Sequence, residues 1–209
     1  MVSNILTRRK DLGITDPPMI LWEPVPGVCS PHDWPACKQT IPLVTVIGPN
    51  INEAASFHAL QIDEHLPFPE FKLQAETLAR KYVPELAPSG AVVFRCGRHG
   101  CFVAWRGGEK WLPAYHRDAK GVVDPTGGGN AFCGGFCVGF VLGKGDFVEA
   151  AKYGNIAAAV VIEQFGLPRL ETLRNDMDMD GDTGLGRELW NGVSMVRRRD
   201  VYHHCVECL

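Results

Sequence analysis

Three consecutive glycines, Gly127–Gly129, stand directly before an uncharged, apolar stretch that runs to about Leu142. Glycine has no Cβ, so main-chain N–H groups in such a run can approach a ligand closely. The start of a helix also leaves N–H donors unpaired and carries a partial positive charge, which suits an anion. No Lys-Ser/Thr pair follows the glycines, so the run is not a Walker A loop. A tight glycine turn packed against a sheet is the alternative, and the run alone does not decide between them.

Composition excludes several classes of function. The 21 basic and 24 acidic residues give a net charge of −3, which offers no general attraction for nucleic acid or an anionic membrane. The apolar run after the glycines is about thirteen residues long, the length of a core helix rather than of a membrane span. Most of the eight cysteines lie in apolar segments and the N-terminus lacks the order of a signal peptide, so we expect a reduced, cytoplasmic setting.

Short apolar runs alternate with segments of helical spacing, which predicts an α/β fold with mostly parallel strands. Strands are expected at 19–22, 43–47, 91–94 and 101–105, and helices at 50–60, 71–82, from the glycines to about 142, and at 147–165. The many prolines predict an extended segment with one strand over residues 1–40. We expect a nucleotide-binding core at 41–170 and an acidic loop and tail at 171–209.

Several pieces in order resemble one family. Residues 124–132, Asp-Pro-Thr-Gly-Gly-Gly-Asn-Ala-Phe, resemble the second signature of the PfkB (ribokinase-like) carbohydrate kinases, and residues 50–53 are similar to its Asn-x-x-Glu element. The turn at 95–100 resembles the family's strand-to-strand turn, and the helix at 150–159 its late helix beside the adenine. With the segments 20–26 and 190–192, the whole most resembles a fungal branch of that family.

The resemblance implies a ribokinase-like three-layer α/β/α fold, here without its N-terminal strands and lid. It implies transfer of the ATP γ-phosphate, with Mg²⁺, to a primary hydroxyl of a sugar or nucleoside. Gly127, Gly128 and Gly129 would form the anion hole, and Asn130 stands at the position of the catalytic base. The remaining residues implied for the nucleotide are Asn50, Arg95, Gly97, Gly100, Thr126 and Asn155.

Two carboxylates are implied as metal residues. Glu53 would hold the aquated Mg²⁺ and Asp124 a monovalent cation such as K⁺. For Glu53 taken alone, the alternative is a first-turn carboxylate favoured by the helix dipole.

Three departures from the family pattern bear on activity. Asn130 replaces the base Asp, and a carboxamide cannot accept the proton of a substrate hydroxyl. Asp118 and Asp146 are possible substitutes that no spacing favours. The acceptor-binding half is expected to be absent, and Arg95 replaces the family's Thr. The alternative function is therefore a catalytically impaired pseudokinase that binds nucleotide or a protein partner, the latter covering an exposed sheet edge.

Other motifs are weaker candidates. Cys205 and Cys208 with His203 and His204 have zinc-ligand chemistry, but an ordinary tail is favoured because a closed zinc site needs four fixed ligands. The acidic run 176–182 lacks the ligand order of an EF-hand. The run 197–199, Arg-Arg-Arg, is interpreted as a solvated helix face.

Overall fold

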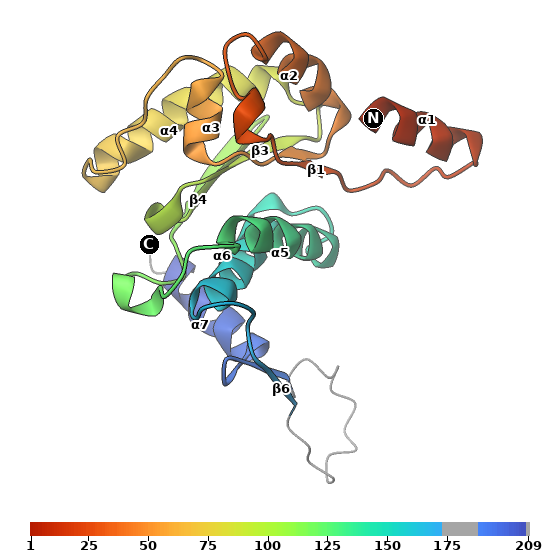
Figure 1. The fold of residues 1–209 in the computed structure, drawn as a ribbon. Coiled ribbons are helices and arrows are strands. Elements are labelled where there is room, and N and C mark those ends of the chain that lie inside the picture. The colour runs from red at the N-terminus through yellow and green to blue at the C-terminus, as the bar shows by residue number, and fades with distance from the viewer. Residues whose placement is uncertain (173–187, 208–209) are drawn as a thin grey trace. The chain divides into compact units, whose positions relative to one another are not determined.

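The computed structural model describes residues 1–172 and 188–207, and the chain divides into two compact units, Met1–Trp111 and Leu112–Leu209 (Figure 1). Each unit is described by itself. The predictions for the acidic run 176–182 and for Cys208 lie outside the described residues.

The first unit is an α/β unit built on a five-stranded sheet. Its helices are α1 (Val2–Asp11), α2 (Trp34–Thr40), α3 (Ile51–Ser56) and α4 (Phe68–Tyr82), with the 3₁₀ turns η1 (Pro26–Val28), η2 (Ile41–Leu43), η3 (Val83–Glu85) and η4 (Gly97–His99). Its strands are β1 (Leu21–Trp22), β2 (Val46–Ile47), β3 (Ala91–Arg95), β4 (Cys101–Trp105) and β5 (Gly108–Leu112), which enters the second unit at its last residue.

The sheet has the order β1-β2-β3-β4-β5 and is mixed. β1 pairs with β2 and β2 with β3 in parallel, whereas β3 pairs with β4 antiparallel, from Ala91 opposite Trp105 to Arg95 opposite Cys101. The prediction of mostly parallel strands is thus corrected. The connection from β3 to β4 is too short for the crossover that a parallel pair requires, so the chain forms a hairpin there.

Strand β5 was not predicted from the sequence. It follows β4 after Arg106 and Gly107, and Gly107 has a φ of 98°, the left-handed conformation that short hairpin turns favour. Its first residues are polar and exposed, as expected of a strand at a sheet edge, and they lack an apolar alternation.

Helices α2, α3 and α4 cover one face of this sheet (Figure 1). The core between them contains fully buried aromatic and aliphatic side chains, and Tyr82 Oη donates a hydrogen bond to the Ala54 carbonyl at 2.8 Å. Its largest members are Ile41, Ile47, Ile51, Phe71, Leu78, Tyr82, Phe94 and Phe102. The core fixes the loops that follow β1, β2 and β3 on the sheet.

Residues 1–40 are not an extended segment throughout, which corrects the prediction. Helices α1 and α2 both lie in this range, and α2 begins with Trp34 and Pro35. Proline is tolerated in the first turn of a helix, because its missing N–H would have no partner there. Pro35 therefore belongs to a helix start rather than to an extended segment.

The second unit is dominated by two helices, α5 (Gly128–Leu142) and α6 (Phe147–Ile162), that pack closely on each other. Small residues allow this approach: a Cβ added at Gly135 would lie 2.6 Å from both the Ala157 Cβ and the Tyr153 carbonyl oxygen. The short connection of residues 143–146 ends at Asp146, whose Oδ1 caps α6 by accepting from the N–H groups of Val148 and Glu149.

The rest of the second unit comprises η5 (Ala119–Gly121), a small antiparallel sheet and α7 (Met195–Glu207). The sheet has the order β6 (Leu170–Thr172), β7 (Glu188–Trp190), β8 (Val193–Ser194). Asn191 and Gly192 connect β7 to β8 with φ values of 53° and 77°, the conformations of a two-residue hairpin turn.

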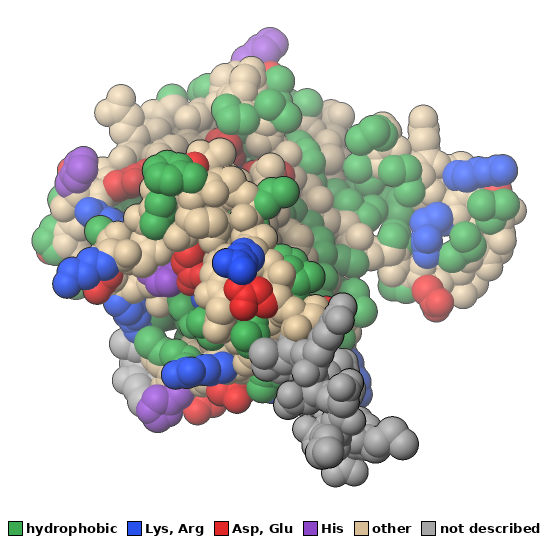
Figure 2. Space-filling model, turned by 60° about the horizontal axis from the view of Figure 1, so that its bottom comes forward, with side chains coloured by type: hydrophobic (Ala, Val, Ile, Leu, Met, Phe, Trp, Pro, Cys, Tyr) green, Lys and Arg blue, Asp and Glu red, His purple; other side chains and the backbone are tan. Residues whose placement is uncertain are grey.

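Acidic and basic side chains are interspersed on the face drawn in Figure 2, in keeping with the balanced net charge. None of the helices in the described ranges has the length and apolar content needed to span a bilayer. The three-layer arrangement stays a prediction, since it depends on how the two units are placed.

Candidate functional site

The glycine run opens α5 as predicted, and Gly127 is its N-cap residue. Gly127 has a φ of 83° and a ψ of −13°, a left-handed conformation that a side chain would strain. The Gly128 N–H donates to the Pro125 carbonyl and the Ala131 N–H to the Gly127 carbonyl. No hydrogen bond from a described residue uses the N–H groups of Gly129 and Asn130, and no side chain caps the helix. These two donors are available to an anion.

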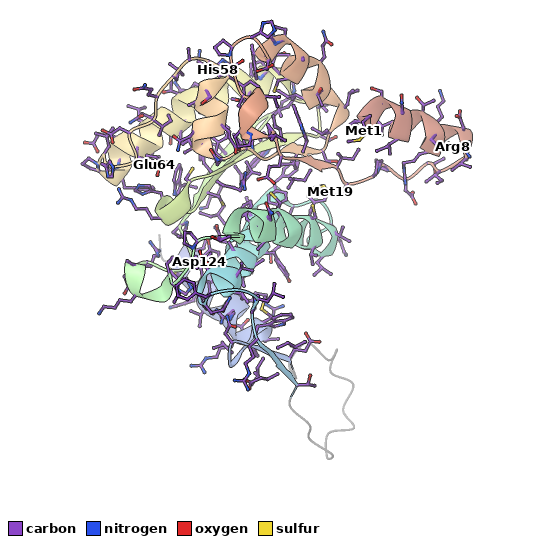
Figure 3. All side chains as sticks on the ribbon, in the orientation of Figure 1. Met1, Arg8, Met19, His58, Glu64 and Asp124 are labelled. Atoms are coloured by element: carbon purple, nitrogen blue, oxygen red, sulfur yellow. The ribbon has the colours of Figure 1, made fainter. Side chains whose placement is uncertain are left out.

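The loop before the helix is held at two points. The N–H groups of Val123 and Asp124 both donate to the Ile162 carbonyl at the end of α6, at 2.8 and 3.2 Å. Asp124, labelled in Figure 3, then accepts the Thr126 N–H on Oδ1 at 2.9 Å. Hydrogen bonds from Thr126 lower the pKa of the Asp124 carboxyl. The turn is therefore ordered by residues of its own unit.

Close packing accounts for part of the glycine run. A Cβ added at Gly128 would lie 2.8 Å from Ile162 Cγ2, and one at Gly127 would lie 3.3 Å from Val161 Cγ1. Gly128 is buried, whereas Gly127 and Asn130 are exposed. The alternative interpretation of a tightly packed turn thus applies to Gly128, although the partner is helix α6 rather than a sheet.

A second group of predicted residues lies in the first unit, where parallel strands end. Asn50 is the N-cap of α3 and follows β2, and Arg95 ends β3. Asn50 Oδ1 accepts the Glu53 N–H and Glu53 Oε2 accepts the Asn50 N–H, each at 2.8 Å. This capping box satisfies two donors of the helix start.

Arg95 lies between two carboxylates. Its Nη2 contacts Oε1 of Glu23, the residue that directly follows β1. The same Nη2 lies 3.6 Å from Oε2 of Glu53. Burial raises the pKa of the Glu53 carboxyl, while the hydrogen bond from the Asn50 N–H and the charge of Arg95 oppose that effect. Residues from the ends of β1, β2 and β3 thus meet at the edge where open α/β sheets bind ligands. Glu23 carried no sequence signal.

A turn connects β3 to β4 at residues 96–100, where the sequence predicts one; its contact with a nucleotide stays a prediction. Gly97 and Gly100 have φ values of 52° and 89°, so both positions favour glycine for conformational reasons. The His99 ring between them stacks on Phe71 with centroids 4.2 Å apart, and Trp111 Nε1 donates to the His99 carbonyl at 3.0 Å.

Asn155, a predicted nucleotide contact, lies in a buried hydrogen-bond network. It is 6% exposed, and its Nδ2 donates to the Pro113 carbonyl at 3.2 Å and to Tyr202 Oη at 2.7 Å. The side chain therefore joins α6 to α7 and to the segment after β5. Contact with a nucleotide stays a prediction.

The two aspartates considered as substitute bases both act as caps. Asp118 Oδ1 accepts the Lys120 N–H at the start of η5, and Asp146 caps α6. Over residues 1–172 and 188–207, no group of three or more His, Cys, Asp or Glu side chains is arranged to hold a metal ion.

Residues 25–172 match the model of the pfkB family carbohydrate kinases. The chain belongs to the pfkB family. That assignment covers Asn50, Glu53, Arg95 and the whole of the glycine loop.

Relatives of this pfkB family chain include two fungal proteins. Protein MAK32 of Saccharomyces cerevisiae is 30% identical over 194 residues, 88% of this chain and 48% of that protein. An uncharacterized protein of Schizosaccharomyces pombe is 27% identical over 208 residues, 89% of this chain and 52% of that protein. The chain spans about half the length of these relatives.

Among solved structures, the ribokinase from Cryptococcus neoformans var. grubii in complex with ADP is similar in fold. It aligns with a TM-score of 0.56 at 18% identity, over 79% of this chain and 52% of that one. The ribokinase-like fold is thereby confirmed for the aligned part.

A charged cluster in the second unit was missed from the sequence. Arg198, in the run interpreted as a solvated helix face, has a side chain only 3% exposed and is paired with Glu163. Asn191 Nδ2 donates to Glu163 Oε2 at 2.9 Å, and His116 Nε2 lies 3.1 Å from Glu163 Oε1. A run of three arginines is usually a solvated face. Only contacts distant in sequence, such as that with Glu163, distinguish Arg198 from its neighbours.

Proposed function

We propose that this chain carries the nucleotide- and phosphate-binding part of a kinase that transfers the ATP γ-phosphate to a primary hydroxyl of a sugar or nucleoside. The observation that carries the proposal is the uncapped start of α5, where the N–H groups of Gly129 and Asn130 lack partners within the described chain. Phosphoryl transfer depends chiefly on donors positioned for the charge on the transferred group. The ADP complex of the similar ribokinase supports a nucleotide as the ligand.

The other residues have assigned roles in this proposal. Gly127 and Gly128 complete the anion hole, with Gly128 also holding the loop against α6. Thr126 and the turn residues Gly97 and Gly100 line the nucleotide. Asn155 has an indirect role in this proposal: its hydrogen bond to Tyr202 joins α6 to α7 and so supports the region that binds the nucleotide.

The chemistry is expected to be slow because of Asn130. In the transfer, the acceptor oxygen forms a bond to the γ-phosphorus, the bond to the ADP oxygen breaks, and the hydroxyl proton must leave. The Asn130 carboxamide can orient the hydroxyl by a hydrogen bond but cannot take that proton. General-base assistance contributes about 10²–10⁴-fold to a rate, so this is the expected deficit.

The two cations implied by the family resemblance, Mg²⁺ and K⁺, do not fit the observed carboxylates equally well. Glu53 Oε2 already accepts the Asn50 N–H and lies beside the Arg95 guanidinium, so the residues do not fit a divalent cation at that oxygen. Asp124 retains an anionic carboxylate beside the loop, and we propose it as the contact for a monovalent cation such as K⁺.

A second candidate function is a catalytically impaired nucleotide-binding protein. Asn130 favours it, because the residue keeps the N–H donor of the anion hole and removes only the base. A partner protein that covers a sheet edge belongs to this candidate.

Binding and transfer can be tested separately. Isothermal titration with ATP tests the nucleotide site, and a sugar and nucleoside panel with labelled ATP tests transfer. Absence of ATP binding at millimolar concentration refutes the kinase and the nucleotide-binding protein alike. Asn130→Asp should raise transfer at least tenfold if the kinase proposal holds, whereas ATP binding without transfer in either protein supports the second candidate.

Asn4→Asp is a matched control for the added charge. Asn4 lies in α1, a helix without buried residues, so this variant should change neither binding nor transfer. An equal effect of both variants would remove Asn130 from the proposed role.

A further inference from the structure

Three residues at the carboxyl ends of neighbouring parallel strands form one ionic cluster in the first unit. Glu23 follows β1, Glu53 lies in the first turn of α3 after β2, and Arg95 is the last residue of β3. Arg95 Nη2 makes both contacts, with Glu23 Oε1 and with Glu53 Oε2. The guanidinium therefore occupies the position beside Glu53 that a cation would take.

Arg95 also retains unused donor capacity. Its side chain is 12% exposed, and its Nε is buried without a hydrogen-bond partner among the described residues, so a ligand reaches this donor only when the side chain moves. A buried charged donor without a partner is costly and is usually satisfied by a ligand or water. Phosphate is the ligand chemistry that suits a guanidinium at a strand end, because its oxygens match the planar donors of arginine.

One oxygen of the Glu53 carboxylate is correspondingly occupied by contacts within the chain. Oε2 accepts the Asn50 N–H at 2.8 Å, and the same oxygen lies 3.6 Å from Arg95 Nη2. Mg²⁺ binds oxygen ligands in nearly ideal octahedral geometry and keeps several waters. A permanent positive charge at this distance opposes a second cation on the same carboxylate.

We propose that Arg95 takes the place of the divalent cation beside Glu53, so that this chain binds the phosphates of a nucleoside triphosphate without requiring Mg²⁺. This inference rests on the proposed function. Glu23 is the internal competitor: its carboxylate must release Nη2, or share it, when a phosphate binds. The residue at position 95 thus determines whether nucleotide binding depends on Mg²⁺.

The test compares ATP affinity by isothermal titration in excess MgCl₂ and in EDTA. For the unaltered chain, the two dissociation constants should agree within about threefold. Arg95→Thr removes the internal cation and should make Mg²⁺ tighten ATP binding about tenfold, the size of one charged hydrogen bond. Arg95→Lys keeps the charge and should retain the weak dependence.

Glu53→Gln completes the comparison. Glutamine can still accept the Asn50 N–H and so preserve the capping box. It should leave the Mg²⁺ dependence of the unaltered chain unchanged, and it should abolish the dependence that Arg95→Thr introduces. Circular dichroism melts of each variant establish that it is folded before titration.

The outcomes separate this inference from the proposed function. If ATP binds the unaltered chain only with Mg²⁺, and Glu53→Gln removes that dependence, Glu53 holds the metal despite Arg95 and the inference is wrong while the nucleotide site stands. If Arg95→Thr behaves like Arg95→Lys, the charge has no such role. If no nucleotide binds under either condition, the proposed function fails and the inference fails with it.

Discussion

Arg198 of α7 and Glu163, the C-cap residue of α6, form a bidentate ion pair, with Nη1–Oε1 at 2.5 Å and Nη2–Oε2 at 2.7 Å. Glu163 directly follows Ile162, whose carbonyl accepts the N–H groups of Val123 and Asp124. The ion pair therefore anchors the helix end that carries the loop before α5.

Arg198→Met should destabilise the chain by about 3 kcal/mol, because it leaves the Glu163 carboxylate without its principal partner in a largely buried place. Arg197→Met is the control: Arg197 is exposed on the same helix, so the change should stay within about 0.5 kcal/mol. Urea unfolding followed by circular dichroism measures both. Equal losses of unfolding free energy in the two variants would show that the buried ion pair contributes no more than an exposed arginine does.

The same pair predicts an acid-dependent loss of stability. Burial raises the pKa of the Glu163 carboxyl, but hydrogen bonds from Arg198 and Asn191 outweigh this and hold it below its ordinary 4.5. A lowered pKa in the folded state gives stability that is present above the unfolded value and is lost as the pH falls through the folded value. The unaltered chain should therefore lose stability relative to Glu163→Gln below about pH 4.5. Unfolding free energies of both proteins from pH 6 to pH 3 test this, and parallel curves would contradict it.

Adjacent glycines in α5 should respond oppositely to alanine. A Cβ at Gly135 would meet Ala157 and the Tyr153 carbonyl at 2.6 Å, whereas one at Gly134 meets nothing within 4 Å. Gly135→Ala should cost about 1–3 kcal/mol by overpacking, although helix propensity returns part of this. Gly134→Ala should stabilise by about 0.5–1 kcal/mol. Thermal unfolding of the two variants checks the pair, and the same sign in both would refute the described packing.

These two glycines show which features the sequence predicts: where the helices lie, but not which of their residues are packed. The positions of α5 and α6 were predictable, since the apolar composition, the cap at Asp146 and the following Gly-Leu-Pro are local signals. So was the glycine loop, because φ near 83° and an uncapped helix start both depend on residues within a few positions. Nothing local distinguishes Gly134 from Gly135.

Long-range contacts account for what was missed. The burial of Arg198 and the place of Glu23 beside Arg95 depend on chain segments brought together only by folding. Strand β5 was missed for a different reason: its polar first residues carry no alternation, and its pairing with β4 rests on the turn at Gly107.

Asp124 offers a test of the loop that leaves the helix packing intact. Asp124→Ala removes the acceptor of the Thr126 N–H, so the turn that leads to Gly127 should lose its fixed geometry. We expect ATP affinity to fall about tenfold, because donors that must first be ordered bind an anion less well. The unfolding free energy should change little, since the bond is exposed.

Asp118→Ala is the matched control. Asp118 makes the same type of bond, to the Lys120 N–H at 2.9 Å, but at the start of η5 rather than before the glycines. It should leave ATP affinity unchanged, as measured by the same titration. If both variants bind ATP like the unaltered chain, the loop geometry set by Asp124 is not what positions the free N–H groups of Gly129 and Asn130, and the ligand is held elsewhere.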